Sequence, residues 1–177
     1  MSTEQIANLI SNDGVVITVP KSVACHSETI QKIYEELEEQ DSTDIHLPVI
    51  DGLNLKRCVE YMRQMEADVE QIHKLPENIP YSGHAVDQTE WEKSYLRNGR
   101  PADQPVDKEY YTGFFPLLGA ANYLACQPLI RIVATEIASS FLGKTDEEVC
   151  KLYDIKEKLT EEQKAKILEE NKWHEER

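Results

Sequence analysis

The hydrophobic pattern at the N-terminus predicts a β-hairpin. Residues 6–10 and 15–19 are mostly apolar and flank the turn sequence Asn12-Asp13-Gly14. An Asp-Gly pair accommodates the positive φ angles that tight hairpin turns require. Pro20 lacks the amide hydrogen that strand pairing uses, so we expect the second strand to end there.

The spacing of apolar residues then changes to that of α-helices, with one short strand between two of them. We expect a helix capped by Ser27, a strand over 45–49, and a second helix capped by Asp51 or Asn54. The apolar faces of the two helices follow an i, i+3, i+4, i+7 pattern: Ile30, Ile33, Tyr34 and Leu37 in the first, and Leu55, Cys58, Val59 and Met62 in the second. Mixed α and β elements within a short stretch indicate an α/β or α+β domain.

Residues 69–112 break this pattern with four prolines and two glycines. Such a composition disfavours regular structure, so we interpret the segment as a variable insert or linker. We expect Trp91, Tyr95 and Leu96 to attach part of it to the surface, with a helical turn near 89–96.

From residue 114 the pattern is helical to the end of the chain. Phe114, Leu117 and Leu124 belong to one apolar face, and Pro128 suits the first turn of the next helix. That next helix extends to Leu142 and is apolar around most of its circumference, so it must be covered on several sides. We expect Gly143 to end it, and two capping boxes, Thr145-x-x-Glu148 and Thr160-x-x-Gln163, to begin two further helices.

The last predicted helix, residues 161–176, is mostly charged. Its only large apolar side chains are Ile167, Leu168 and Trp173. A helix of about 15 residues is marginally stable alone in water, and three apolar side chains contribute little to its folding. Two interpretations stay open: a frayed terminal helix that docks on its own domain, or half of an interface that a partner completes.

Charge excludes two classes of partner. The chain has 177 residues and a net charge of −14, which repels the phosphate groups of nucleic acids and of anionic membranes. No apolar run is long enough for a transmembrane helix, and the first residues do not resemble a secretory signal. We therefore expect neither nucleic acid nor membrane as a partner.

Catalytic and metal-binding motifs are absent from the sequence. Cys25, Cys58, Cys126 and Cys150 form no CxxC pair, and no histidine has a ligand-like spacing to them, so we expect reduced structural thiols and no metal. No GxSxG, HExxH, P-loop or GxGxxG string occurs, so we expect neither enzymatic activity nor a cofactor. Cys25 and His26 are adjacent, but neighbouring side chains point apart, so they make a poor nucleophile–base pair.

Five segments resemble the Skp adaptor family, the small subunit of SCF cullin–RING ubiquitin ligases. They are SNDGVVITVP at 11–20, IHLPVID at 45–51, AANYL at 120–124, GKTDEEVCKLYDI at 143–155 and LTEEQKAKILEENKWHEE at 159–176. The resemblance implies an α/β (α+β) BTB/POZ-type fold with a C-terminal helical extension that binds F-box proteins. Residues 1–68 and 113–142 would form the BTB/POZ fold, 69–112 the insert, and 143–177 the helical dimerisation extension.

The resemblance also implies two binding surfaces and a bridging function. Asn122 and Tyr123 would contact a cullin. The F-box site would comprise Ile130, Ala134, Ile137, Phe141, Tyr153, Ile155, Ile167, Leu168 and Trp173. The implied function is that of an adaptor between a cullin and F-box substrate receptors in ubiquitin-dependent degradation, located in cytoplasm and nucleus.

One alternative stays open at this point. The same fold could serve a non-ligase assembly protein that self-associates, as a homodimer without a partner, or that binds F-box proteins without a cullin. The sequence does not identify the F-box proteins, the cullin paralogue or the substrates.

Overall fold

The computed structural model describes residues 5–37, 43–68, 72, 88–101, 106–156 and 159–170. The chain divides into two compact units, an N-terminal unit of residues 1–142 and a C-terminal unit of residues 143–177. The predicted hairpin is confirmed: β1 (Ile6–Ser11) pairs antiparallel with β2 (Val16–Pro20). Gly14 has a φ of 81°, and the amide of Ser11 donates to the carbonyl of Val15.

A third strand, β3 (Asp44–Leu47), pairs parallel with β1, so the sheet order is β2-β1-β3. A parallel pair requires a crossover, and two helices precede β3: α1 (Lys21–Ala24) and α2 (Glu28–Leu37). The short helix α1 was not predicted, because four residues are too few to show a helical period. Ser27 caps α2 as expected, since its hydroxyl accepts from the amide of Ile30 at 3.1 Å.

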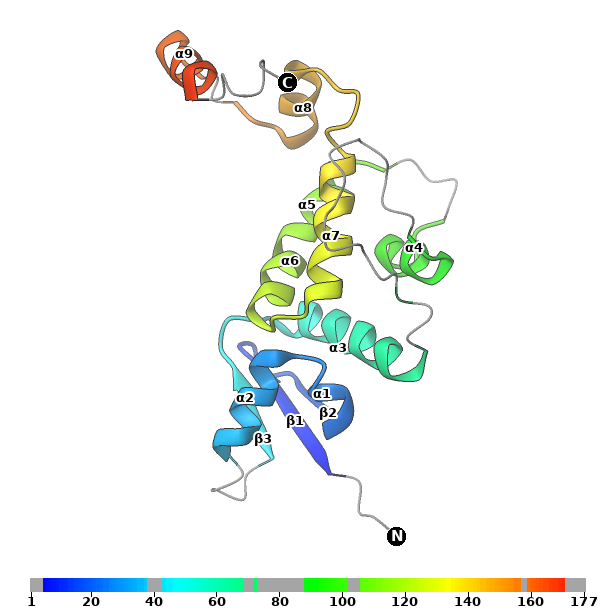
Figure 1. Cartoon of the computed structure of the whole chain (residues 1–177). Helices are drawn as coiled ribbons and strands as arrows, with labels where there is room; N and C mark the ends of the chain where they lie inside the picture. The colour runs from blue at the N-terminus through cyan, green and yellow to red at the C-terminus, as the bar shows by residue number, and fades with distance from the viewer. Residues whose placement is uncertain are drawn as a thin grey trace. The chain divides into compact units, whose positions relative to one another are not determined.

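Helix α3 (Gly52–Ala67) lies between the sheet and the later helices of the N-terminal unit (Figure 1). Asp51 rather than Asn54 is its N-cap, because the Asp51 carboxylate accepts from the amide of Asn54 at 2.9 Å. Gly52 permits the close approach of the hairpin, since a Cβ atom there would overlap the Val15 side chain. The four predicted apolar residues of α3 are all buried.

The segment expected to be an insert or linker contains two helices among its described residues. Helix α4 (Glu90–Arg97) begins with a capping box of Thr89 and Glu92, so the expected helical turn is a full helix. Trp91 and Tyr95 stack with ring centroids 5.2 Å apart, and Tyr61 of α3 lies against both rings. The N-terminal unit therefore extends through this segment.

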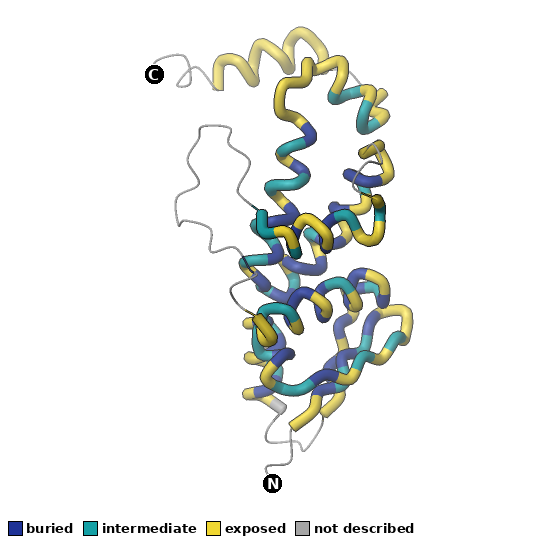
Figure 2. The backbone as a smooth tube through the Cα atoms, turned by 90° about the vertical axis from the view of Figure 1, so that its right-hand side faces the viewer, coloured by how far each residue is buried: buried dark blue, intermediate teal, exposed yellow. Residues whose placement is uncertain are grey.

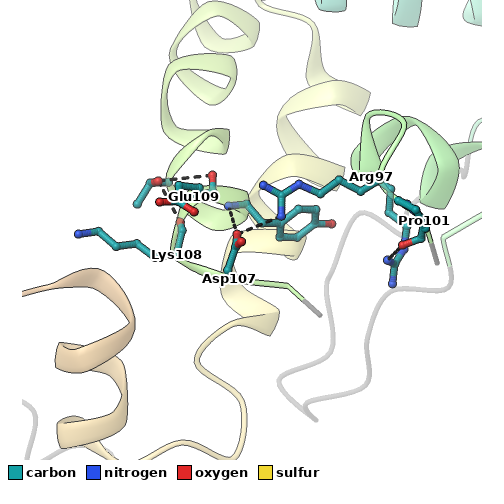
Figure 3. A network of polar contacts seen from close by, with 8 residues as sticks. Arg97, Pro101, Asp107, Lys108 and Glu109 are labelled. Atoms are coloured by element: carbon teal, nitrogen blue, oxygen red, sulfur yellow. Dashed lines mark hydrogen bonds and ion pairs between the residues drawn. The ribbon is translucent and has the colours of Figure 1, made fainter. Parts of the chain in front are cut away.

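Helix α5 (Lys108–Thr112) also lies within the expected insert and was missed. Asp107 caps it, because its carboxylate accepts from the amide of Tyr110 at 2.9 Å. The same carboxylate accepts from Arg100 at 3.0 Å, while Arg97 donates to the carbonyl of Pro101 (Figure 3). One ring contact joins α5 to α6, because Tyr110 packs edge-on against Phe114. Within α5, Tyr110 also packs edge-on against Tyr111.

Helices α6 (Phe114–Tyr123) and α7 (Gln127–Ser139) follow one another through a short turn and pack side by side (Figure 1). Pro128 lies in the first turn of α7, as predicted. The prediction that α7 extends to Leu142 was wrong. The helix ends at Ser139, and residues 140–142 form tighter i→i−3 turns before Gly143, which has the expected positive φ.

The C-terminal unit, described by itself, contains α8 (Asp146–Tyr153) and α9 (Glu161–Glu170). Both predicted capping boxes are present. Thr145 and Glu148 exchange hydrogen bonds at the start of α8, and Thr160 and Gln163 do so at the start of α9.

Candidate protein-binding surfaces

The first surface is the C-terminal end of α6, where Asn122 is exposed and Tyr123 is half-buried. Two hydroxyl groups from the start of α2 hold this end in place. Thr29 donates to the carbonyl of Tyr123 and Ser27 donates to the carbonyl of Leu124, both at 2.6 Å. These bonds satisfy carbonyls that a helix end leaves without intrahelical partners. The predicted cullin-contact residues are therefore presented from a fixed helix end.

The turn after α6 adds to this rigidity. Ala125 adopts a left-handed conformation with a φ of 50°, and the amide of Cys126 donates back to the carbonyl of Ala121. A left-handed residue followed by such a bond is the usual helix-ending motif, although glycine is preferred at that position. The chain thus reverses directly into α7.

The same candidate surface includes Phe115, which the sequence pattern did not single out. Its side chain is 48% exposed, and it lies seven residues before Asn122 on the same face of α6. Gly119 lies between them, and a Cβ atom there would meet nothing within 4 Å. The exposed ring of Phe115, the uncovered backbone at Gly119 and the exposed amide of Asn122 therefore form one stripe along α6. The apolar period of α6 assigns Phe115 no role, so only its exposure reveals it.

The predicted F-box residues of α7 differ in burial. Ile137 is only 8% exposed and belongs to the core of its own unit, whereas Ile130 is half-buried and Ala134 is exposed. The fully covered side of α7 is formed by Leu129, Ile132 and Val133. The helix is thus covered by its own unit on one side and accessible on the other.

The residues just after α7 include two large apolar side chains that are exposed. Phe141 is 44% exposed and Leu142 is 53% exposed, both in the turns that follow Ser139. Their predicted place inside a helix was wrong, but their apolar surface is accessible from the turn.

In the C-terminal unit, α8 begins with three acidic residues and a capping box. Hydrogen bonds from the Thr145 amide and hydroxyl stabilise the Glu148 carboxylate and lower its pKa. Tyr153 is half-buried at the end of α8, Asp154 follows with a left-handed φ of 55°, and Ile155 is 49% exposed. Local polar contacts rather than a core therefore define this helix.

Helix α9 is exposed along its whole length (Figure 2). Ile167 is 43% exposed and Leu168 is 66% exposed, and no described residue of the C-terminal unit is buried. The predicted anchor Trp173 lies outside the described residues. The described part of the extension thus presents apolar side chains without enclosing them.

The chemistry of the cysteines agrees with structural thiols. All four are free. Burial raises the pKa of Cys58 to about 12 and that of Cys126 to about 11, which disfavours the reactive thiolate. Burial also raises the pKa of Cys25, and Nε2 of the neighbouring His26 lies 2.8 Å from the Glu66 carboxylate. This pair therefore lacks the features of an activated nucleophile.

The described residues contain neither a metal-binding cluster nor a membrane-spanning helix. No group of three His, Cys, Asp or Glu side chains is arranged to hold a metal ion there. Among those same residues, no helix combines the length and apolar character that crossing a membrane requires.

Comparison with known proteins identifies relatives along nearly the whole chain. A model described as "Skp1 family, tetramerisation domain" matches residues 5–66, and one described as "Skp1 family, dimerisation domain" matches residues 127–174. A Dictyostelium discoideum protein named SCF ubiquitin ligase complex protein SKP1a is 30% identical over 178 residues, covering 97% of each chain.

Fungal relatives give the same result. The E3 ubiquitin ligase complex SCF subunit sconC of Neosartorya fischeri is 30% identical over 168 residues, which covers 95% of this chain and 97% of the relative. The protein of the same name in Arthroderma otae is 28% identical over 169 residues. With an α+β N-terminal unit and C-terminal helices in the same order as these domains, the chain belongs to the Skp1 family.

Proposed function

We infer that this chain is an adaptor subunit of an SCF-type ubiquitin ligase, bridging a cullin and F-box substrate receptors. The observation that carries the proposal is the match to SCF subunits over 97% of both chains, which includes both family domains in order. The exposed apolar side chains of the C-terminal unit add support, because such surface favours association with another protein.

The proposed cullin surface is the exposed stripe of α6. Phe115 and Asn122 supply an aromatic ring and an amide, and Tyr123 lies beside them at the fixed helix end. A rigid surface loses little conformational entropy on binding, which favours affinity.

The proposed F-box surface combines accessible residues of two parts of the chain, each of which offers apolar area by itself. Ile130, Ala134 and Phe141 belong to the N-terminal unit. Tyr153, Ile155, Ile167, Leu168 and the predicted anchor Trp173 belong to the C-terminal unit. Ile137 is placed in the core, so we assign it a supporting function beneath this surface rather than a direct contact.

The adaptor acts through geometry rather than chemistry. Holding a substrate receptor at a fixed place raises the effective concentration of the substrate near the ubiquitin-charged enzyme. The raised pKa values of Cys58 and Cys126 agree with structural functions for these two thiols. A cytoplasmic and nuclear location stays a prediction, as does a homodimer when no partner is bound.

Capture assays with a purified cullin and an F-box segment test the proposal. We expect Asn122→Lys with Tyr123→Lys to abolish cullin capture and to retain F-box capture. The matched control, Glu90→Lys with Ser94→Lys, places two lysines at exposed positions of α4 and should retain both. Wild-type protein that captures the F-box segment but no cullin would favour the assembly protein instead.

A second pair of variants addresses the F-box surface. Ile167→Gln with Leu168→Gln should weaken F-box capture about tenfold or more, because the apolar contacts of both side chains with the F-box segment would be lost. Glu162→Gln with Glu169→Gln changes the opposite side of α9 and should leave capture unchanged. Equal capture by both double variants would contradict the assignment of α9.

A further inference from the structure

A small pocket in the N-terminal unit gathers arginines in an otherwise acidic chain. It has a volume of about 130 Å³ and lies where α3, α4 and the start of α5 and α6 meet. Its lining includes Arg57, Arg97 and Arg100, which are three of the six arginines in the sequence. Among the described residues of the lining, Glu109 is the one acidic residue.

Arg57 is the unusual member of this group. Its guanidinium carbon lies 5.3 Å from the ring centroid of Tyr95 and 5.7 Å from that of Phe114. Its Nε and Nη2 atoms are buried and have no hydrogen-bond partner within the described part of the chain. Burying charged donors without acceptors is unfavourable, so these N–H groups favour an acceptor that the described side chains do not supply.

The two nitrogens share one edge of the guanidinium plane. That edge carries two parallel N–H groups, the arrangement that binds two oxygens of a carboxylate or phosphate group at once. The rings of Tyr95 and Phe114 also contact the guanidinium group, so this buried edge holds the donors that lack an acceptor.

Arg97 and Arg100 add donors to the same pocket. Arg97 uses one nitrogen for the carbonyl of Pro101, and Arg100 uses one for Asp107 (Figure 3). A guanidinium group carries five N–H donors, so each of these side chains has others to offer. The Glu109 carboxylate repels an anion, but its side chain is exposed and can turn toward solvent.

We propose that this pocket binds a phosphate group, either free or as a small phosphate monoester, with Arg57 as the main ligand. A phosphate dianion offers more oxygens and more charge to three guanidinium groups than a single carboxylate does. The volume equals that of about four water molecules, which is enough for one phosphate group. Because the Arg57 edge is covered, binding requires a neighbouring side chain to move aside.

Phosphorus NMR and thermal unfolding of the full chain test this site, with inorganic phosphate and O-phosphoserine as probes and chloride at equal ionic strength as reference. At a phosphate concentration ten times Kd, the folding equilibrium should shift about elevenfold relative to chloride. Binding of both probes identifies a monoester site, and binding of inorganic phosphate alone identifies a site for the free ion.

Variants at the pocket distinguish a specific site from general attraction of anions. Arg57→Gln and Arg100→Gln should each weaken binding about tenfold or more, while Glu109→Gln should strengthen it. Arg63→Gln, at an exposed position on the same helix as Arg57, should bind as the wild type does. The proposal is overturned if phosphate acts no differently from chloride, if acetate binds equally well, or if Arg100→Gln and Arg63→Gln bind alike.

Discussion

The two units of this chain reach helical structure in different ways. In the N-terminal unit, side chains such as Leu9, Tyr61 and Leu117 are fully enclosed, and helix ends are tied to distant elements, as Ser27 is to Leu124. In the C-terminal unit, no described residue is buried, and capping boxes define the helices. The first unit is stabilised by its own core, whereas the described residues of the second have helix-capping signals but no core, and we propose that a partner protein buries their apolar side chains.

The largest expected difference between the two units is the loss in the free energy of unfolding when one leucine is replaced in each. Leu117→Ala removes a fully enclosed side chain and should lower the free energy of unfolding by about 2–5 kcal/mol. Leu168→Ala removes a side chain that is 66% exposed and should change it by less than about 0.5 kcal/mol. Urea denaturation measures both, and a similar loss in the two variants would contradict the comparison.

Truncation after Gly143 removes nearly all of the C-terminal unit. We expect the free energy of unfolding of the remaining chain to change by less than about 1 kcal/mol, because the enclosed core belongs to the other unit. F-box capture should be lost. A truncated chain that captured an F-box segment normally would exclude the proposed function of the extension.

Helix caps provide a smaller test. Ser27→Ala removes the cap of α2 and leaves the buried carbonyl of Leu124 without its donor, so it should cost about 1–3 kcal/mol in global stability. Thr145→Ala removes the cap of α8 and should lower only the local helicity, which circular dichroism of an isolated 143–156 peptide can follow. A large global loss from Thr145→Ala would show that α8 is part of the same core.

The smallest expected difference between the two units is in how their carboxylates affect stability at acid pH. Hydrogen bonds from the amide and side chain of Asn54 lower the pKa of Asp51 below 3.8. Because its pKa is lower in the folded state, the Asp51 carboxylate stabilises the fold at pH values above its unfolded-state pKa. This stabilisation is lost as the pH falls through its folded-state pKa. Stability measured from pH 5 down to pH 2 should therefore decline less steeply in Asp51→Asn than in the wild type. The pKa of Glu148 is also lowered, but Glu148→Gln should not alter the slope of global stability against pH.

The sequence predicted elements whose signals are local. Short segments of sequence determine the hairpin, the cap at Ser27, the buried face of α3 and both capping boxes. Helices α4 and α5 were underestimated because prolines and glycines on either side obscured them. Both are also stabilised by residues of other helices: α4 packs against Tyr61, and Tyr110 of α5 donates to Glu136. Local composition does not report such contacts.

The binding surfaces were predicted in outline only. Exposure depends on how neighbouring elements pack, so the helical pattern could not separate the buried Ile137 from the exposed Ala134 on α7. The same limit hid Phe115, whose exposure follows from the packing of α6 on other helices. The family resemblance supplied Asn122 and Tyr123, which the hydrophobic pattern alone does not distinguish.

Hydrogen–deuterium exchange of residues 159–170, with and without an F-box segment, tests the central claim most directly. Amides of α9 should exchange nearly as fast as an unstructured peptide in the chain alone, because the helix encloses no apolar side chain. Adding the F-box segment should slow their exchange at least tenfold, while the amides of β1, the central strand of the sheet, should change little. Slow exchange of α9 in the chain alone, with no further change on adding the segment, would contradict the account.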